Sequence, residues 1–133
     1  MSLKYPHMMP EDVPVWERWL AAYHMDGTDY AYDTKVGESI TTPEDFPEPY
    51  ASMGYLLAKK RIDVVLTFID RIVVAEVKRK AGWTAIGQLL GYPLLFSREF
   101  STELPITGLL ICESLTLDTQ TILDTYKLPY IIV

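Results

Sequence analysis

The segment that most constrains the fold is an apolar stretch over residues 61–78, broken once by a polar pair at 70–71. Its Ile, Val, Leu and Phe residues are enriched in strands, and a polar pair between two such runs is typical of a tight turn. The stretch therefore predicts a β-hairpin. Three charged residues, Asp63, Glu76 and Lys78, interrupt the apolar pattern. Because a buried carboxylate costs free energy unless it is paired or binds a cation, these three are the first candidates for function.

The parity of the strands decides whether the three charged side chains can meet. Residues two apart point to the same face, so Glu76 and Lys78 share one. A loop at 70–71 sets Asp63 opposite Lys78, whereas a loop at 69–70 sets Asp63 opposite Glu76. Either two-residue loop puts all three on one face, with opposed Cβ atoms about 4.5–5.5 Å apart. A three-residue loop would turn Asp63 to the other face.

Two carboxylates and one ammonium group on a sheet surface suit a hard divalent cation. Mg²⁺ takes oxygen ligands, usually one or two carboxylates, and keeps several waters. A bound metal lowers the pKa of its water and stabilises charge on a phosphoryl oxygen, and a nearby lysine stabilises developing negative charge. The pattern predicts phosphodiester hydrolysis with Mg²⁺, for which Mn²⁺ substitutes.

At these residues the sequence resembles the PD-(D/E)xK nuclease superfamily, the fold of many restriction enzymes, junction resolvases and DNA-repair exonucleases. The family has an acid on one strand and then acid, spacer and lysine on the next, which Asp63 and Glu76-Val77-Lys78 match. The resemblance implies that Asp63 and Glu76 bind the metal, helped by the Val77 carbonyl. It implies that Lys78 serves the nucleophilic water. Ile62 stands where the family has a proline.

The following helix extends the resemblance. Members often carry a glutamine and a tyrosine one turn apart there, as Gln88 and Tyr92 are, similar to the nuclease domains of bacterial recombination helicase-nucleases. The resemblance implies that Gln88 completes the catalytic site, with Tyr92 as a further contact or, alternatively, a core aromatic. Members also often carry an acid on the first helix. Glu17 is the candidate, and its alternative interpretation is an ordinary boundary glutamate.

The composition bounds the class of protein. A chain of 133 residues predicts one domain, 1–133, and its one cysteine, Cys112, excludes a disulfide framework, a zinc ribbon and a four-cysteine iron–sulfur cluster. No apolar run approaches the roughly 20 residues that span a bilayer. The start of the chain lacks a signal-peptide pattern. We therefore expect no membrane partner and a cytoplasmic location.

The net charge of −6 counts against nonspecific nucleic-acid affinity, which depends on lysine and arginine. The basic residues are grouped, however, before the first hairpin strand and at the end of the second. The groups are Lys59, Lys60 and Arg61, and then Arg79 and Lys80 beside the catalytic lysine. In the hairpin both groups lie at the same end of the sheet, which predicts contacts with nucleic acid. Their alternative interpretation is a solvated rim.

The remaining elements follow from periodicity and from helix-end signals. We predict helices at 10–24, 83–100 and 117–126, strands at 29–37, 106–112 and 130–133, and an acidic, proline-rich loop at 37–50. The first helix has Asp12 as N-cap and a core stripe of Val13, Trp16, Leu20 and Tyr23. Pro93 predicts a kink or a break in the second helix. The third is capped by Thr116 or Asp118 and anchored by Leu117, Ile122, Leu123 and Tyr126. Residues 51–58 fit either a helical turn or a strand lead-in.

The order α-β-β-β-α-β-α-β predicts an α/β fold with a mixed central sheet flanked by helices, as in a restriction-endonuclease-like core. The leading functional hypothesis is a Mg²⁺-dependent nuclease acting on nucleic acid, with DNA as the expected substrate and a homodimer as an open option. The alternative is a non-catalytic domain of the same fold that binds nucleic acid or protein.

Overall fold

The computed structural model describes residues 4–37 and 60–133. Within them the chain forms α1 (Val13–Tyr23), β1 (Asp29–Val36), β2 (Lys60–Thr67), β3 (Ile72–Ala81), α3 (Trp83–Glu99), β4 (Ile106–Leu115), α4 (Leu117–Thr125) and β5 (Tyr130–Ile132). The predicted order of elements is confirmed. The predicted loop beyond residue 37, the undecided segment 51–58 and Lys59 lie outside the described residues.

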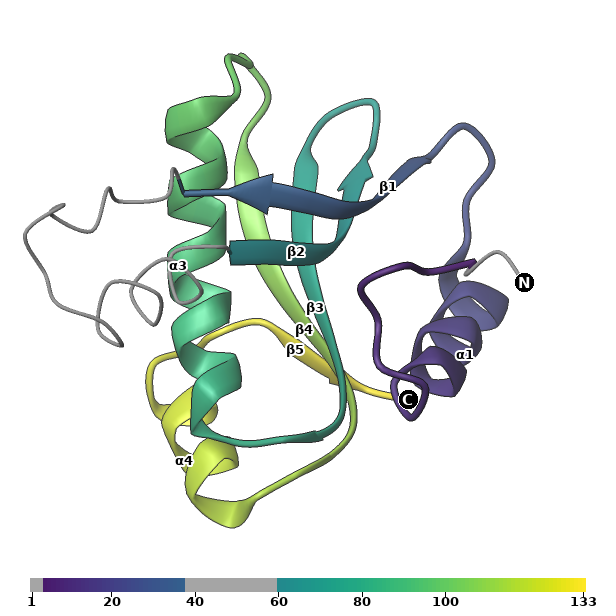
Figure 1. The fold of residues 1–133 in the computed structure, drawn as a ribbon. Helices are drawn as coiled ribbons and strands as arrows, with labels where there is room; N and C mark the ends of the chain where they lie inside the picture. The colour runs from purple at the N-terminus through teal and green to yellow at the C-terminus, as the bar shows by residue number, and fades with distance from the viewer. Residues whose placement is uncertain (1–3, 38–59) are drawn as a thin grey trace, which may run out of the picture.

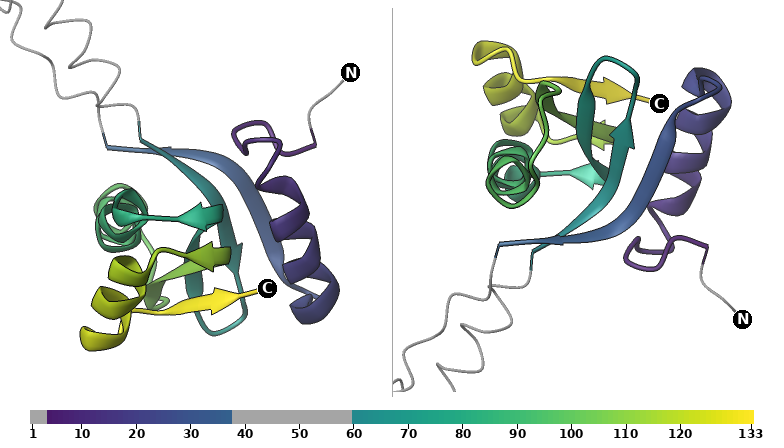
Figure 2. Two further views of the ribbon diagram at one scale, coloured as in Figure 1. Left: turned by 90° about the horizontal axis from the view of Figure 1, so that it is seen from below. Right: turned by 90° about the horizontal axis from the view of Figure 1, so that it is seen from above.

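The described strands form one five-stranded sheet in the order β1-β2-β3-β4-β5. The first three are antiparallel neighbours, and β3, β4 and β5 run parallel to one another. The helices α3 and α4 make the two crossovers that parallel neighbours require. Figure 2 shows α1 against one face of the sheet and α3 with α4 against the other. The predicted mixed sheet flanked by helices is therefore confirmed.

Both faces of the central strands are buried, which explains their nearly continuous apolar sequences. On the α1 face, Val64 and Ala75 pack in one cluster with Trp16. On the α3 face, Val74 packs in another cluster that includes Phe96. Since residues alternate between faces, the side chains at positions 76 and 78 share the α3 face with Val74.

The β2–β3 hairpin settles the loop position. Thr67 pairs with Ile72. The Phe68 amide then donates a hydrogen bond of 2.8 Å to the Arg71 carbonyl, which closes a two-residue loop at 69–70. By the same count Asp63 stands opposite Glu76, not opposite the lysine. The second of the two predicted registers is therefore the observed one.

Helix α1 is shorter than predicted, and its buried stripe is only partly the predicted one: Trp16 is in the core, and Val13 and Leu20 pack against it. Its buried residues are Val15, Trp16 and Trp19, whereas Tyr23, predicted in the core, is 47% exposed. The indoles of Trp16 and Trp19 stack with ring centroids 5.1 Å apart. Trp16 is buried as predicted, whereas Trp19 was not predicted in the core; its large indole packs on that of Trp16 and turns the buried stripe of the helix toward position 19.

Pro93 does not divide α3, which is continuous over its 17 residues. A proline removes the hydrogen bond to the carbonyl four residues earlier, here that of Leu89. This carbonyl lies against Gly108 of β4: a Cβ at Gly108 would stand 2.7 Å from the Leu89 oxygen and 3.0 Å from Pro93 Cγ. The helix therefore passes Pro93 while packed directly on the backbone of β4.

The carboxyl-terminal elements match their predicted positions but not all their anchors. Strand β4 extends to Leu115, and Cys112 is fully buried as predicted. Thr116 caps α4 by accepting from the Thr119 amide at 3.4 Å. The prediction that Leu117 and Tyr126 anchor α4 is wrong, because they are 79% and 72% exposed. The helix is short, and its burial is concentrated at Thr119 and Leu123.

Candidate active site

The candidate site lies where β2 and β3 separate. The last residue pair between them is Val64–Ala75. Before Val64, β2 pairs only with β1, and after Ala75, β3 pairs only with β4. In Figure 1 the first part of β2 runs horizontally, whereas β3 runs vertically. We call this opening the fork. It leaves backbone N–H groups of β3 without a partner strand, and such groups need other acceptors.

Two carboxylates fill the fork. The Val77 amide donates to Asp63 Oδ2 at 2.9 Å, and the Asp63 amide donates to Glu76 Oε1 at 3.3 Å. The side chains thus replace the missing ladder bonds. Asp63 is 6% exposed and Glu76 is 2% exposed, so both acids are buried beside each other.

Burial governs the protonation of this pair. The pKa of Glu76 is raised to about 9, by burial first and by the neighbouring charge of Asp63 second, while Lys78 acts in the opposite direction. A carboxyl group with this pKa is neutral at pH 7. The pair therefore carries less negative charge than two free carboxylates, and a cation that binds here competes with a proton on Glu76.

Lys78 follows on the same face of β3 and is half-buried. Its charge acts on Glu76 and also on Asp12, so the ammonium group lies within electrostatic reach of both acids. Val77, between the two catalytic candidates, is fully buried. The structure thus brings the predicted group of Asp63, Glu76 and Lys78 together.

Gln88 and Tyr92 lie on α3, which packs against the same face of the sheet, where Tyr92 contacts the cluster that contains Val74. Gln88 Nε2 donates to the Tyr92 hydroxyl at 3.4 Å, which leaves Gln88 Oε1 buried without a hydrogen-bond partner. Burial raises the pKa of Tyr92, and the charges of Glu76 and Asp63 add to this, so the phenol lies near the acids. A buried oxygen without a partner is costly, and it is the kind of group that a bound water or ligand satisfies.

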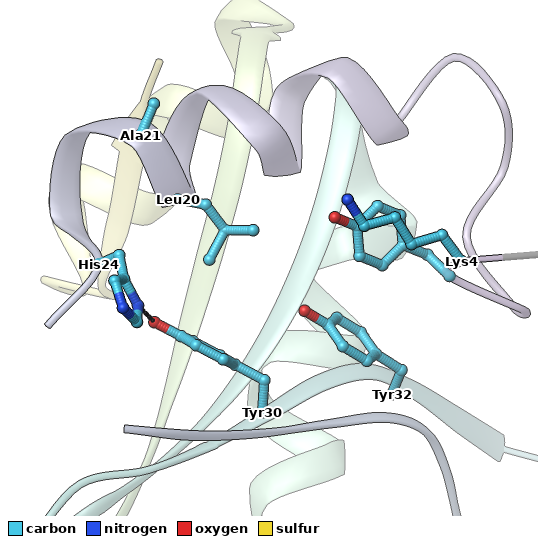
Figure 3. A pocket seen from close by; sticks show the side chains of 7 residues that line it. Lys4, Leu20, Ala21, His24, Tyr30 and Tyr32 are labelled. Carbon is cyan, nitrogen blue, oxygen red and sulfur yellow. Dashed lines mark hydrogen bonds between the residues drawn. The ribbon is translucent and has the colours of Figure 1, made fainter. Parts of the chain in front are cut away.

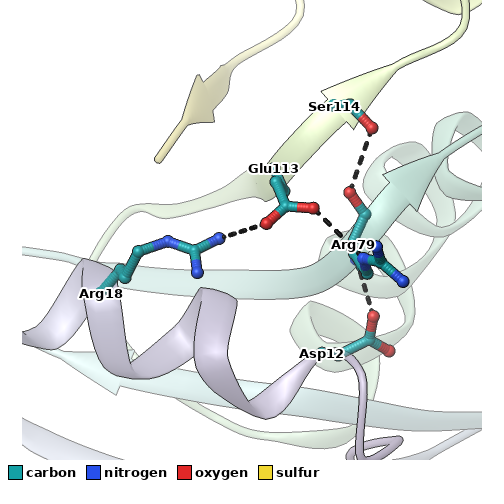
Figure 4. A network of polar contacts seen from close by, with 5 residues as sticks. All are labelled: Asp12, Arg18, Arg79, Glu113 and Ser114. Carbon is teal, nitrogen blue, oxygen red and sulfur yellow. Dashed lines mark hydrogen bonds and ion pairs between the residues drawn. The ribbon is translucent and has the colours of Figure 1, made fainter.

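Sequence reasoning missed the role of Asp12. Asp12 was predicted to cap α1, but its side chain makes no capping hydrogen bond. Instead, its Oδ1 accepts a hydrogen bond from the Arg79 amide at 2.7 Å (Figure 4). Arg79 and Val77 expose their amides at the same edge of β3, so Asp12 is a further carboxylate at the fork. Burial raises the pKa of Asp12. The available signal was an acid just before a proline-led helix, which also fits an ordinary cap.

Glu17, the predicted helix acid, is exposed on α1, and no contact joins it to the fork in the described part of the chain. The acid that α1 brings to the site comes from its start instead. The reason is the observed rotation of the helix, which buries the two indoles and turns position 17 to solvent.

The basic residues near the fork are largely engaged with acids. Glu113 binds Arg18 at 2.9 Å and Arg79 at 3.2 Å, which ties α1 to β3 and β4 (Figure 4). Arg61 Nε lies 3.7 Å from Asp33 Oδ1. Lys80 is exposed and Lys60 is half-buried. This end of the sheet therefore carries charge of both signs, and the predicted contacts of these basic residues with nucleic acid stay a prediction.

The donor set is small for a metal site. Within residues 4–37 and 60–133, no group of three or more His, Cys, Asp or Glu side chains could hold a metal ion. Mg²⁺ needs only one or two carboxylates when waters complete its shell, so the pair in the fork meets that lower requirement. The unpartnered Gln88 oxygen adds a group that can hold such a water.

Comparison of the chain with protein-family models, with characterised proteins and with solved structures finds no match. No helix among the described residues is long and apolar enough to cross a membrane.

Proposed function

We propose that this chain is a Mg²⁺-dependent nuclease with a restriction-endonuclease-like core, which hydrolyses phosphodiester bonds of nucleic acid, most simply DNA. The observation that carries the proposal is the fork, where two buried acids from neighbouring strands lie on the same face as a lysine. Helix α3, which packs on this face, adds a buried glutamine oxygen without a hydrogen-bond partner. Charged groups concentrated at a break in an otherwise apolar sheet are costly to stability, which favours a functional explanation.

Each residue has a role in this proposal. Asp63 and Glu76 would hold the metal, with the Val77 carbonyl as a further oxygen. The ion, when bound, supplies a water of lowered pKa and stabilises charge on the phosphoryl oxygens. Lys78 stabilises the negative charge that develops as the phosphate is attacked. Gln88 accepts a hydrogen bond from the attacking water through its free Oε1.

Single substitutions test the proposal directly. Asp63→Ala, Glu76→Ala and Lys78→Ala should each abolish Mg²⁺-dependent cleavage of single-stranded, double-stranded and branched DNA, measured on gels, while circular dichroism shows a folded chain. The matched control is Asp70→Ala, which removes an exposed acid at the other end of the same hairpin and should leave cleavage unchanged. Wild-type cleavage that survives in all three folded variants refutes the assignment.

The second candidate is a non-catalytic binding domain of the same fold. It is favoured by the absence, among the described residues, of a group of three or more candidate metal ligands, and by the acids that engage Arg61 and Arg79. A ligand of the native state raises the melting temperature, so millimolar Mn²⁺ or Mg²⁺ separates the two candidates. A shift in wild type that is lost in Asp63→Ala supports the nuclease. No shift and no cleavage support the binding domain.

A further inference from the structure

A concave site lies on the opposite face of the sheet from the buried acids, between α1 and β1. It is an open pocket of about 490 Å³, which is within the size range of small-molecule sites. Its lining comes from three segments: Lys4 and Tyr5 of the amino-terminal segment, Leu20, Ala21 and His24 of α1 and its end, and Tyr30 and Tyr32 of β1. We call it the tyrosine pocket (Figure 3). None of these residues belongs to the candidate active site.

The aromatic walls of the tyrosine pocket are fixed in place. Tyr30 and Tyr32 are two apart on β1, so their rings share a face and rise toward α1 in Figure 3. The Tyr30 hydroxyl and His24 Nδ1 are 2.6 Å apart, and the Tyr32 hydroxyl accepts from Trp16 Nε1 at 3.2 Å. Trp16 is fully buried and meets both tyrosine rings edge-on. Rigid, half-exposed rings of this kind are suitable stacking surfaces.

The charge of the lining differs from that of the whole chain. The chain carries a net charge of −6, yet the lining holds a lysine and a histidine and no carboxylate. Lys4 Nζ lies 5.5 Å from the centre of the Tyr5 ring, so its positive charge stands beside the aromatic lining and repels a cationic ligand. Asp26, outside the lining, stands 3.4 Å from His24 Nε2, so Lys4 is the principal positive charge facing the pocket. A flat, aromatic and anionic group is the complementary ligand.

We propose that the tyrosine pocket binds an unpaired nucleotide of a single-stranded nucleic acid, with its base against the Tyr30 ring and its phosphate beside Lys4. Stacking on aromatic side chains combined with a nearby cation is how proteins hold unpaired strands without reading sequence. The pocket is close to the fork along the sheet, because Tyr32 of β1 pairs with Val64 of β2, the residue after Asp63. The assignment rests on the proposed nuclease function. It adds a site that holds the nucleic-acid strand at a distance from the acids.

Binding without metal tests this assignment separately from cleavage. Fluorescence anisotropy of labelled oligothymidylate, measured in EDTA, should show Tyr30→Leu binding about tenfold more weakly than wild type, because one stacking contact is lost. Tyr30→Phe keeps the ring and should stay within about twofold of wild type. Lys4→Glu, which reverses an exposed charge and leaves the core intact, should also weaken binding about tenfold. A parallel series with oligouridylate shows whether the strand is DNA or RNA.

Matched controls lie elsewhere on the molecule. Tyr126→Leu removes a 72% exposed ring just after α4, and Arg98→Glu reverses an exposed charge near the end of α3. Both variants should bind as wild type does. Circular dichroism confirms that each variant is folded, and Lys4→Glu carries the test if Tyr30→Leu does not fold. Wild type that fails to bind either oligonucleotide, or equal binding by wild type and Lys4→Glu, overturns the assignment even if Mg²⁺-dependent cleavage is observed. Absent cleavage together with the expected binding losses would instead remove the nuclease proposal alone.

Discussion

At the scale of single residues, Glu76 is the most informative side chain, because its neutral form is stable in the fold. Its pKa is raised from 4.5 to about 9 by burial first and by Asp63 second. Between these two values the unfolded chain is ionised and the folded chain keeps its proton, so rising pH lowers the free energy of unfolding. Below about pH 4 both states are protonated and the effect vanishes.

Glu76→Gln should therefore stabilise the protein in a pH-dependent way. Glutamine keeps an oxygen for the Asp63 amide and has no charge to bury. At pH 7 we expect a gain of about 2 to 3 kcal/mol, which shrinks toward zero near pH 4. Urea denaturation of wild type and variant across this range measures it. A constant difference between the variants over the whole range would show that Glu76 does not titrate as described.

At the scale of elements, Asp12 connects the start of α1 to the open edge of β3. Asp12→Ala leaves the Arg79 amide without its acceptor, and a lost buried hydrogen bond of this type costs about 1 to 3 kcal/mol. Thermal denaturation should show this loss. Glu11→Ala, an exposed neighbour, is the control and should change stability by less than about 0.5 kcal/mol. Equal effects of the two substitutions would mean that the contact is unimportant for stability.

The packing of α3 on β4 gives two glycine substitutions of opposite sign. In Gly108→Ala the new Cβ would meet the Leu89 oxygen at 2.7 Å and its Cδ1 at 2.9 Å, so strands and helix must shift, at a cost of about 1 to 3 kcal/mol. In Gly91→Ala the new Cβ meets nothing within 4 Å, and alanine should stabilise the helix by about 0.5 to 1 kcal/mol. Chemical denaturation of both variants checks the pair. Destabilisation by Gly91→Ala would indicate a contact on that outer face.

The same elements show how far the sequence could be interpreted. The hairpin was predictable because its apolar runs are long and the side-chain period of a strand is two, and parity alone placed Glu76 and Lys78 together. The exact position of the hairpin loop was not predictable, because loops at 69–70 and at 70–71 both put Asp63, Glu76 and Lys78 on the same face. The contribution of Asp12 could not be predicted at all. It depends on where β2 leaves β3 and on how two indoles rotate α1, and both are tertiary effects without a local pattern.

At the scale of the whole molecule, the sheet separates two sites with opposite electrostatic character. The α3 face carries the buried acids of the fork, and the α1 face carries the tyrosine pocket, whose lining has no carboxylate. The two sites are close along the sheet, because β2, which carries Asp63, pairs with β1, which carries Tyr30 and Tyr32. In the proposed function, neighbouring strands therefore position a metal ligand on one face and a holding site for the nucleic acid on the other.

The stabilisation of the whole chain by metal should depend on pH, because a cation in the fork must displace the proton of Glu76. A ligand present at about 100 times its dissociation constant adds about 2.7 kcal/mol to the free energy of unfolding. Ionisation of Glu76 becomes more favourable as pH approaches 9, so the affinity for Mn²⁺ should rise over this range. The rise in melting temperature at fixed millimolar Mn²⁺ should consequently be larger at pH 8.5 than at pH 6.5, and differential scanning fluorimetry measures it. In Glu76→Gln the shift should be small and independent of pH, since no proton is released. A wild-type shift that does not change with pH would place the metal away from Glu76.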